Sequence, residues 1–184
     1  MGIILLSVAI AFDINYLNYS RPIPYSQLQK IRFSDFRALR KPGMTLNGVN
    51  EFAYIKTNRI IRNLNNGDVE ITTYFHPSRS YVFENNIRDR DLLTHELYHF
   101  HISEYFTRLL RKEILESPDN ISNKMIARLN KKYYELENEM QLKYDEDTYH
   151  SYVMHEQKNW EIRTYSLLRS LADFSSPLIG VRSK

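Results

Sequence analysis

The chain of 184 residues contains no cysteine. Disulfide bonds and thiolate metal ligands are therefore excluded, so any bound metal ion must be held by His, Asp or Glu side chains. The sequence also contains no internal repeat and no low-complexity stretch, which argues against a repeat architecture. A chain of this length with ordinary apolar content is sufficient for one domain with its own core.

Long hydrophobic runs are also missing. The longest, within residues 1–12, has about ten apolar residues, which is too short to span a bilayer but suits the apolar part of a signal peptide. A basic segment before it and a convincing cleavage site are both absent. Three interpretations remain open: a signal sequence shortened at its front, a short membrane anchor, or a first buried strand. We expect the first, which makes residues 1–30 an apolar segment with its connector and leaves possible membrane proximity.

No single sign of charge dominates the chain. It has 25 basic and 22 acidic residues, a formal net charge of +3 and a pI near 9.0, but acidic residues are interleaved with the basic ones and form no basic stripe. A nucleic-acid partner is therefore not expected. Near the end of a predicted helix, Arg108, Arg111 and Lys112 are expected to complement the helix dipole.

The residues that are present predict a β region followed by helices. Residues 31–84 are rich in aromatic and β-branched side chains broken by turn signals, which indicates a small antiparallel sheet. Asn66-Gly67 is the best hairpin turn because both residues tolerate positive φ. The flanking segments 59–64 and 69–75 are its expected strands, and the second alternates so that one face can be buried.

Three helices are expected after residue 88. The first covers residues 89–116 and ends before Pro118. The second carries an apolar stripe from Ile121 to Met140, which we interpret as core packing. Residues 144–151 are expected to form a short acidic connector before a last helix that contains Trp160. The predicted fold class is therefore α+β and zincin-like, with a buried motif helix, in a domain covering residues 31–184.

The most informative segment is His95-Glu96-Leu97-Tyr98-His99, inside the first predicted helix. Residues four apart lie on one face of a helix, so both imidazoles can bind one zinc ion while Glu96 faces water on that ion. The segment lies in a strongly apolar helix, where two imidazoles and a carboxylate are costly without a partner. The alternative is that His95 and His99 lie at the edge of the core and hydrogen-bond backbone carbonyls.

A catalytic zinc ion usually has three protein ligands and a water molecule. His101 and Glu104 would point away from the two motif histidines, so the third ligand must come from elsewhere. We predict His150, in a segment that can fold back beside the motif helix. The carboxylates of Asp145, Glu146 and Asp147 are competitors, and Asp145 could instead orient a ligating imidazole. The remaining alternative is a solvated connector in which Asp147 or Thr148 is an N-cap.

A donor beside the metal ion is needed to stabilise charge on a carbonyl oxygen. Tyr144 and Tyr152 flank the proposed third ligand and are the nearest candidates in sequence, and we select Tyr144 for this catalytic role. With fourteen tyrosines in the chain, simple packing is the competing explanation for both. His76 and His155 are expected to be ordinary surface or edge residues.

Several short blocks resemble a bacterial family of predicted secreted zinc-dependent proteases that is catalogued as a domain of unknown function. The similarity extends from about residue 31 to residue 171. The matching blocks, in chain order, are Phe33-Ser34-Asp35-Phe36, Ser80-Tyr81-Val82, His95-Glu96-Leu97-Tyr98-His99-Phe100, Ile102, Glu104, Leu109-Leu110-Arg111, Tyr144-Asp145, Thr148, His150-Ser151, Gln157 and Trp160.

The chain departs from the family pattern at Leu97, where the family usually has Gln, and at His101, where it usually has Asp. These changes leave the predicted ligands and base in place but affect the hydrogen bonding around them. The resemblance implies that His150 is a functional position and that the protein is secreted, periplasmic or otherwise in the cell envelope.

Together these features predict a zinc-dependent metallopeptidase that acts on a peptide or protein substrate. Zinc bound by His95, His99 and His150 would activate water, with Glu96 as the general base. A free sheet edge could bind an extended peptide. Two alternatives remain open: a metal-dependent hydrolase of non-peptide amides or esters, and a structural or binding domain of the cell envelope whose metal site is fully coordinated or empty.

Overall fold

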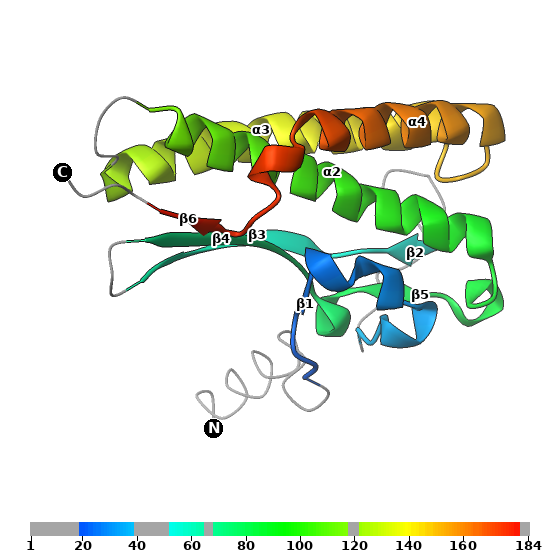
Figure 1. Cartoon of the computed structure of the whole chain (residues 1–184). Helices are drawn as coiled ribbons and strands as arrows, with labels where there is room; N and C mark the ends of the chain where they lie inside the picture. Colours follow the sequence, from blue (N-terminus) through cyan, green and yellow to red (C-terminus); the bar gives the residue numbers. More distant parts are fainter. Residues whose placement is uncertain (1–18, 39–51, 65–67, 118–121, 181–184) are drawn as a thin grey trace, which may run out of the picture.

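Three long helices cover one face of a small antiparallel sheet (Figure 1). The computed structural model describes residues 19–38, 52–64, 68–117 and 122–180. The helix that contains the histidine motif lies between the sheet and the two later helices (Figure 1). The prediction of an α+β fold, with the sheet in the N-terminal half and three helices after it, is confirmed.

The main sheet has the strand order β1-β4-β3, with β6 also paired to β4. β3 (Thr57–Asn63) and β4 (Val69–Phe75) pair in antiparallel register from Thr57 opposite Phe75 to Asn63 opposite Val69. The predicted hairpin strands are thus confirmed, while the expected Asn66-Gly67 turn lies outside the described residues. The short strands are β1 (Ile23–Pro24), β6 (Leu178–Ile179), and β2 (Ala53–Tyr54) with β5 (Tyr81–Val82), which form a separate two-stranded sheet.

Two of the three long helices begin at a side-chain cap. α2 (Arg90–Leu115) begins where the Asp89 carboxylate accepts hydrogen bonds from the amides of the first turn, as an N-cap does. α3 (Asn123–Thr148) begins at Ser122, whose side chain caps Met125. α4 (Met154–Ser170) follows. The 3₁₀ segments are η2 (Tyr25–Lys30), η3 (Phe33–Asp35), η4 (Pro77–Arg79), η5 (Glu84–Asn86) and η6 (Ala172–Phe174).

α3 is longer than the sequence suggested. Residues 144–148, expected to be part of a connector, form its last turn and a half. Tyr144 and Thr148 lie four residues apart and are both buried, so they continue the inward-facing side of the helix. Thr148 and Asp147 therefore belong to α3 and do not cap α4, whose N-cap is Val153. This extension carries Asp145 on a rigid helix.

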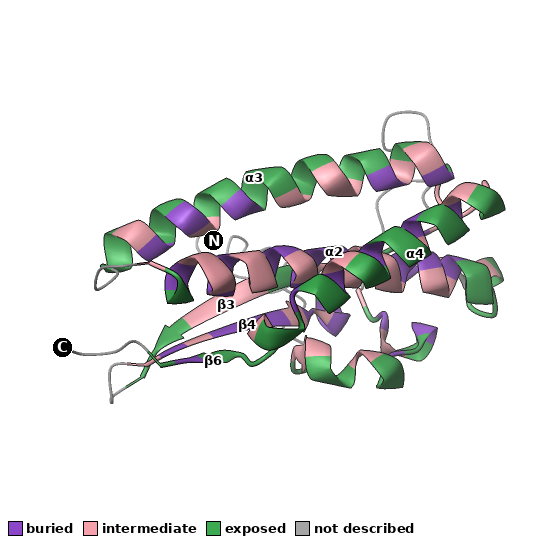
Figure 2. Ribbon diagram, turned by 45° about the horizontal axis from the view of Figure 1, so that its top comes forward, coloured by how far each residue is buried: buried purple, intermediate pink, exposed green. Residues whose placement is uncertain are grey.

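Two apolar clusters involve different halves of α2, and the buried residues line the inner faces of the helices and sheet (Figure 2). One cluster joins α2 to α3, α4 and β4 around Phe106, Tyr144 and Trp160. The other joins the N-terminal half of α2 to the β2–β5 sheet, the end of β4 and residues 31–36, around Phe75 and Phe100. Because α2 contributes to both, packing holds it along its whole length.

The C-terminal half of α2 carries a buried ion-pair cluster, formed by Glu104, Arg108, Arg111 and Thr73. Glu104 Oε1 accepts hydrogen bonds from Arg111 Nη1 at 2.9 Å and from Arg108 Nε at 3.1 Å. Glu104 Oε2 accepts one from Thr73 Oγ1 at 2.6 Å. Arg111 also donates to the carbonyl oxygens of Ile71 and of η6. Arg108 and Arg111 were expected to serve the helix dipole, but the structure shows that they bind this carboxylate inside the fold.

β1 and η2 precede the expected domain boundary at residue 31, yet β1 pairs with β4 and η2 packs beside it. Residues 1–18, on which the expectation of a signal or anchor depends, lie outside the described part of the chain. Among the helices of the described residues, none is long and apolar enough to cross a membrane.

Candidate metal centre

His95 and His99 lie one turn apart on α2 and face Asp145 on α3. The distance from Asp145 Oδ1 to His99 Nε2 is 2.9 Å and to His95 Nε2 is 3.2 Å. The two Nε2 atoms are 3.2 Å apart. Ligand atoms around a tetrahedral zinc ion, with bonds of about 2.0–2.1 Å, are separated by about 3.3 Å. These three residues, called the metal triad below, can therefore hold a metal ion with little movement.

Two glutamines orient the imidazoles of the metal triad. His99 Nδ1 hydrogen-bonds the side-chain oxygen of Gln141, whose Nε2 donates to the His99 carbonyl at 3.0 Å. His95 Nδ1 lies 3.2 Å from Gln157 Oε1. A proton on each Nδ1 leaves the Nε2 lone pairs directed at the centre of the triad, as metal-binding histidines require. The ring nitrogens use side-chain partners in the described structure, which differs from the alternative of bonds to backbone carbonyls.

Without a cation, three electron-pair donors would face one another in the triad. Burial lowers the pKa of His95 to about 4. Burial also acts to lower the pKa of His99, but the charge and hydrogen bond of Asp145 outweigh this effect. The pKa of His99 is therefore raised from 6.5 to about 9. Burial acts to raise the pKa of Asp145, but the charge of His99 outweighs it, so this pKa lies well below its usual value. The triad thus attracts a cation, and a proton on His99 competes with a metal ion for the same position.

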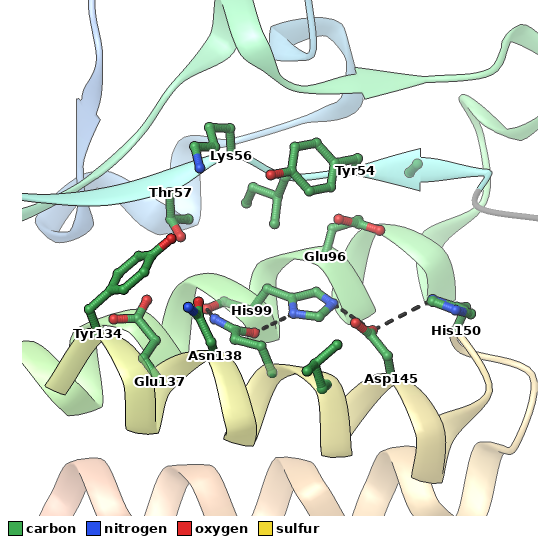
Figure 3. Close-up of a pocket in the computed structure, with 14 residues that line it drawn as sticks. Tyr54, Lys56, Thr57, Glu96, His99, Tyr134, Glu137, Asn138, Asp145 and His150 are labelled. Atoms are coloured by element: carbon green, nitrogen blue, oxygen red, sulfur yellow. Dashed lines mark hydrogen bonds and ion pairs between the residues drawn. The ribbon is translucent and has the colours of Figure 1, made fainter. Parts of the chain in front are cut away.

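A cavity of about 420 Å³ opens beside the triad. Residues 53–57 form one wall, and α3 residues between Tyr134 and Asp145 form the other, as the close-up shows (Figure 3). His99 and Asp145 face this space from below, and Glu96 lies beside them with its carboxylate toward the cavity (Figure 3). The triad is therefore open to a small molecule or an extended chain from one side.

Glu96 is in a position suited to its predicted role. It is buried, it follows His95 in α2, and it lines the same cavity as His99 and Asp145. Its negative charge contributes to the raised pKa of His99. A carboxylate at the cavity wall beside a metal ion can accept a proton from water bound there.

The cavity wall formed by residues 53–57 has a backbone edge with which no described residue pairs. The Lys56 amide donates to Ser80 Oγ at 2.8 Å, and the Lys56 carbonyl accepts from the His76 amide at 2.8 Å. The Phe52 carbonyl accepts from the Phe83 amide at 2.9 Å. Backbone groups of successive residues in an antiparallel strand point alternately to the two edges. Residues 52 and 56 use one edge, so the backbone groups of the alternate residues Ala53, Ile55 and Thr57 point to the other edge and face the cavity. An extended peptide could pair with this edge.

The segment predicted to supply the third ligand lies beside the motif, but Asp145, and not the predicted His150, is the residue that joins the two histidines. Asp145 completes the metal triad. His150 lines the cavity with Nδ1 at 3.6 Å from Asp145 Oδ1, so it lies next to the triad without belonging to it. The other carboxylates face away: Glu146 is exposed, and Asp147 accepts hydrogen bonds from Trp160 and Lys143.

The two candidate tyrosines do not face the metal triad through their hydroxyl groups. Tyr144 is fully buried, with its ring stacked on His95 at 4.6 Å and its hydroxyl donating to Gln157 Oε1 at 2.8 Å. This placement makes it a support beneath the triad, in line with the packing explanation. Tyr152 is exposed and near Phe52. His155 is exposed and His76 hydrogen-bonds Asn58, as expected of residues outside the site.

Sequence reasoning missed Gln141 as part of the site. It lies one helical turn before Asp145, so a search for polar residues on the same face of α3 would have found it. Comparison of the chain with protein-family models, curated proteins and solved structures gives no significant match. The geometry of the metal triad therefore carries the functional conclusion.

Proposed function

We propose that this protein is a zinc-dependent metallopeptidase with a zincin-like arrangement of its motif helix. The observation that carries the proposal is the convergence of His95 Nε2, His99 Nε2 and Asp145 Oδ1 within 3.2 Å of one another, on one wall of an open cavity. Two imidazoles and one carboxylate with an open position are a ligand set typical of catalytic zinc. The absence of cysteine leaves no thiolate ligands that would favour a closed structural site.

Zinc at the triad would lower the pKa of a bound water molecule and polarise a substrate carbonyl. Glu96 accepts the proton of the attacking water and passes it to the leaving amine, which completes the hydrolysis. Gln141 and Gln157 hold the two imidazoles in the tautomer that leaves Nε2 free. Tyr144 holds Gln157 and stacks on His95, so it acts as a positioning residue.

A peptide is the favoured substrate because the cavity lies along a strand edge that has no partner within the described part of the chain. The backbone groups of residues 53, 55 and 57 face the cavity, and main-chain hydrogen bonds can bind an extended chain largely independently of its sequence. A non-peptide amide or ester would use the same triad but would gain nothing from this edge. A secreted or cell-envelope location, implied by the family resemblance, belongs to the same proposal.

A second candidate function is a non-catalytic metal site. It is favoured by His150, whose Nδ1 is 3.6 Å from the Asp145 carboxylate and could supply a fourth ligand after a small rotation. Structural zinc sites have four protein ligands, whereas catalytic sites keep one position for water. His150 would then have the ligand role predicted from the sequence, with Asp145 beside it.

Metal content and peptide hydrolysis should be measured together for the parent protein and three variants, Glu96→Gln, Asp145→Ala and His150→Ala. We expect one zinc per chain in the parent and in Glu96→Gln, with turnover of a quenched fluorescent peptide mixture reduced about 10²–10⁴-fold in Glu96→Gln. Asp145→Ala should lose both zinc and activity. Full zinc content without hydrolysis in the parent would favour the non-catalytic site. A parent that cannot be loaded with zinc would overturn both functions.

A further inference from the structure

The two glutamines that orient the metal triad are held by different kinds of partner. Gln141 Nε2 donates to the backbone carbonyl of His99 at 3.0 Å. A carbonyl can only accept, so the main chain of α2 fixes which end of the Gln141 amide faces His99 Nδ1. Gln157 has a side chain as its partner instead. Its Nε2 donates to Glu161 Oε1, one helical turn later in α4, at 3.3 Å.

The Tyr144 hydroxyl does not fix the orientation of the Gln157 amide. It lies 2.8 Å from Gln157 Oε1 and 3.2 Å from the carbonyl oxygen of His95. A hydroxyl group both donates and accepts, so it can donate to the Gln157 oxygen, or it can accept from the amide nitrogen and donate to the His95 carbonyl. Thr148 Oγ1 lies 3.5 Å from His95 Nδ1, which is longer than an ordinary N–H···O hydrogen bond. Both orientations of the amide therefore satisfy these neighbours.

Glu161 is the neighbour that distinguishes the two orientations. A carboxylate only accepts hydrogen bonds, and the other oxygen of Glu161 pairs with Lys158 Nζ at 2.7 Å. Reversal of the Gln157 amide would place its oxygen against the Glu161 carboxylate, where two acceptors repel each other. Gln157 is 2% exposed, so water would not relieve this cost. The Gln157 nitrogen therefore stays toward Glu161, and its oxygen stays toward His95.

The orientation of this amide determines which ring nitrogen of His95 carries the proton. The Gln157 oxygen, 3.2 Å from His95 Nδ1, accepts a hydrogen bond from that nitrogen and leaves the Nε2 lone pair for a metal ion. A competing acceptor lies at the other nitrogen, because Asp145 Oδ1 is 3.2 Å from His95 Nε2. With the amide reversed, Nδ1 would face a donor, and the proton would move to Nε2, where it blocks the ligand atom.

We propose that Glu161 is a positioning residue of the metal triad, which acts through Gln157 to hold His95 in the tautomer that binds metal. Glu161 is not among the described residues that line the cavity, so it acts through the amide and does not touch the substrate. Loss of a hydrogen-bond partner behind a metal-binding histidine typically lowers metal affinity by about 10–100-fold. This inference rests on the zinc site of the proposed function, but the tautomer of His95 is also a property of the metal-free protein.

The first measurement is the zinc affinity of the parent and three variants, by competition with a chromophoric chelator. Glu161→Leu removes the acceptor and should weaken zinc binding about 10–100-fold. Glu161→Gln keeps an oxygen that can accept from Gln157, so it should retain most of the affinity. Lys158→Ala, the matched control, removes the exposed partner of Glu161 but leaves its carboxylate, and should change the affinity little. Equal losses in both Glu161 variants would indicate an effect of the lost charge alone and would overturn the proposal.

NMR of the ring nitrogens in the metal-free proteins reports the tautomer directly, because protonated and bare nitrogens have different chemical shifts. We expect the His95 proton on Nδ1 in the parent, in Glu161→Gln and in Lys158→Ala, and a shift of this proton toward Nε2 in Glu161→Leu. An unchanged proton position or an unchanged zinc affinity in Glu161→Leu would overturn the role of Glu161 while the proposed function stands. A parent that binds no zinc would overturn the proposed function, and the NMR comparison would still decide whether Glu161 sets the tautomer.

Discussion

Two buried polar groups of residues on α2 differ in how their charges match. In the ion-pair cluster, the Glu104 carboxylate accepts hydrogen bonds from Arg108, Arg111 and Thr73, so acceptors face donors. In the metal triad, two imidazole nitrogens and a carboxylate oxygen face one another within 3.2 Å. Both are shielded by the same helix and neighbouring elements. Burial alone therefore does not distinguish the two groups; what distinguishes the triad is that its three facing atoms can all bind one cation, a proton or a metal ion.

The difference extends to the backbone. All three non-glycine residues of positive φ in the described ranges follow Thr148, at the end of α3 that carries the triad's Asp145. Strain of this kind needs compensation from elsewhere in the fold. The residues of the ion-pair cluster have no such strain, and Arg111 joins α2 to β4 and to η6. One cluster thus stabilises the fold, and the other is available for chemistry.

The largest expected effect on stability comes from breaking the ion-pair cluster. Glu104→Gln leaves two buried guanidinium groups without their carboxylate and should lower the free energy of unfolding by about 3–5 kcal/mol, measured by urea denaturation. The matched control is Glu135→Gln, which removes an exposed pair with Lys131 at 3.8 Å and should change stability by less than about 1 kcal/mol. Unchanged stability in Glu104→Gln would contradict the structural role of the cluster.

Zinc should stabilise the fold through the metal triad alone. At a free zinc concentration one hundred times the dissociation constant, the free energy of unfolding should rise by about 2.7 kcal/mol. Asp145→Ala should abolish this gain, whereas Glu135→Gln should keep it. The measurement is denaturation with and without zinc for each protein. A gain that survives in Asp145→Ala would show that zinc binds somewhere other than the triad.

As the pH rises, the stability of the metal-free protein should fall and its affinity for zinc should increase. In the metal-free protein, the pKa of His99 is raised from 6.5 to about 9, so its stabilising contribution is complete below pH 6.5 and is lost as pH rises toward 9. Zinc competes with that proton, so zinc affinity should increase up to about tenfold per pH unit over the same range. Titrations between pH 6.5 and 8, with His99→Gln as the control that removes both trends, would test this. A zinc affinity that does not change with pH would contradict competition between zinc and a proton on His99.

The smallest expected effect comes from relieving strain next to the triad. Ser151 has φ of 77°, a conformation that glycine adopts without a steric cost, so Ser151→Gly should raise the free energy of unfolding by about 0.5–1 kcal/mol. Ser151→Ala keeps the Cβ atom and should bring no gain. Thermal unfolding of the two variants beside the parent is sufficient. A loss of stability in Ser151→Gly would show that the Ser151 side chain is needed in the turn.

Local patterns in the sequence predicted most of the fold. Alternation around residues 69–75 predicted β4, and the apolar spacing of residues 89–116 predicted α2 almost to its ends. The end of α3 was missed because the acidic run around Asp145 resembles a solvated connector, and only the burial of Tyr144 and Thr148 reveals it as helix. β6 has two residues, too few to form a detectable pattern.

The candidate site was predictable only in part. The spacing of His95 and His99 places both rings on one face of any helix, so this half of the triad required no knowledge of tertiary structure. The choice among Asp145, Glu146, Asp147 and His150 depends on the rotation of α3 about its axis, which the sequence alone could not specify. The burial of Arg111 was missed for a similar reason, since its acceptors on β4 and η6 lie far away in sequence.

The pairing of β6 with β4 has a consequence for synthesis of the chain. Val69 on β4 pairs with Ile179, 110 residues later, and the Ile71 amide donates to the Pro177 carbonyl at 2.8 Å. A growing chain must therefore leave this part of the β4 edge uncovered until its last described residues have left the ribosome. Uncovered edges invite pairing with other chains. Premature termination before residue 177 should thus yield protein that aggregates, even though the motif helix and all residues of the metal triad have been made.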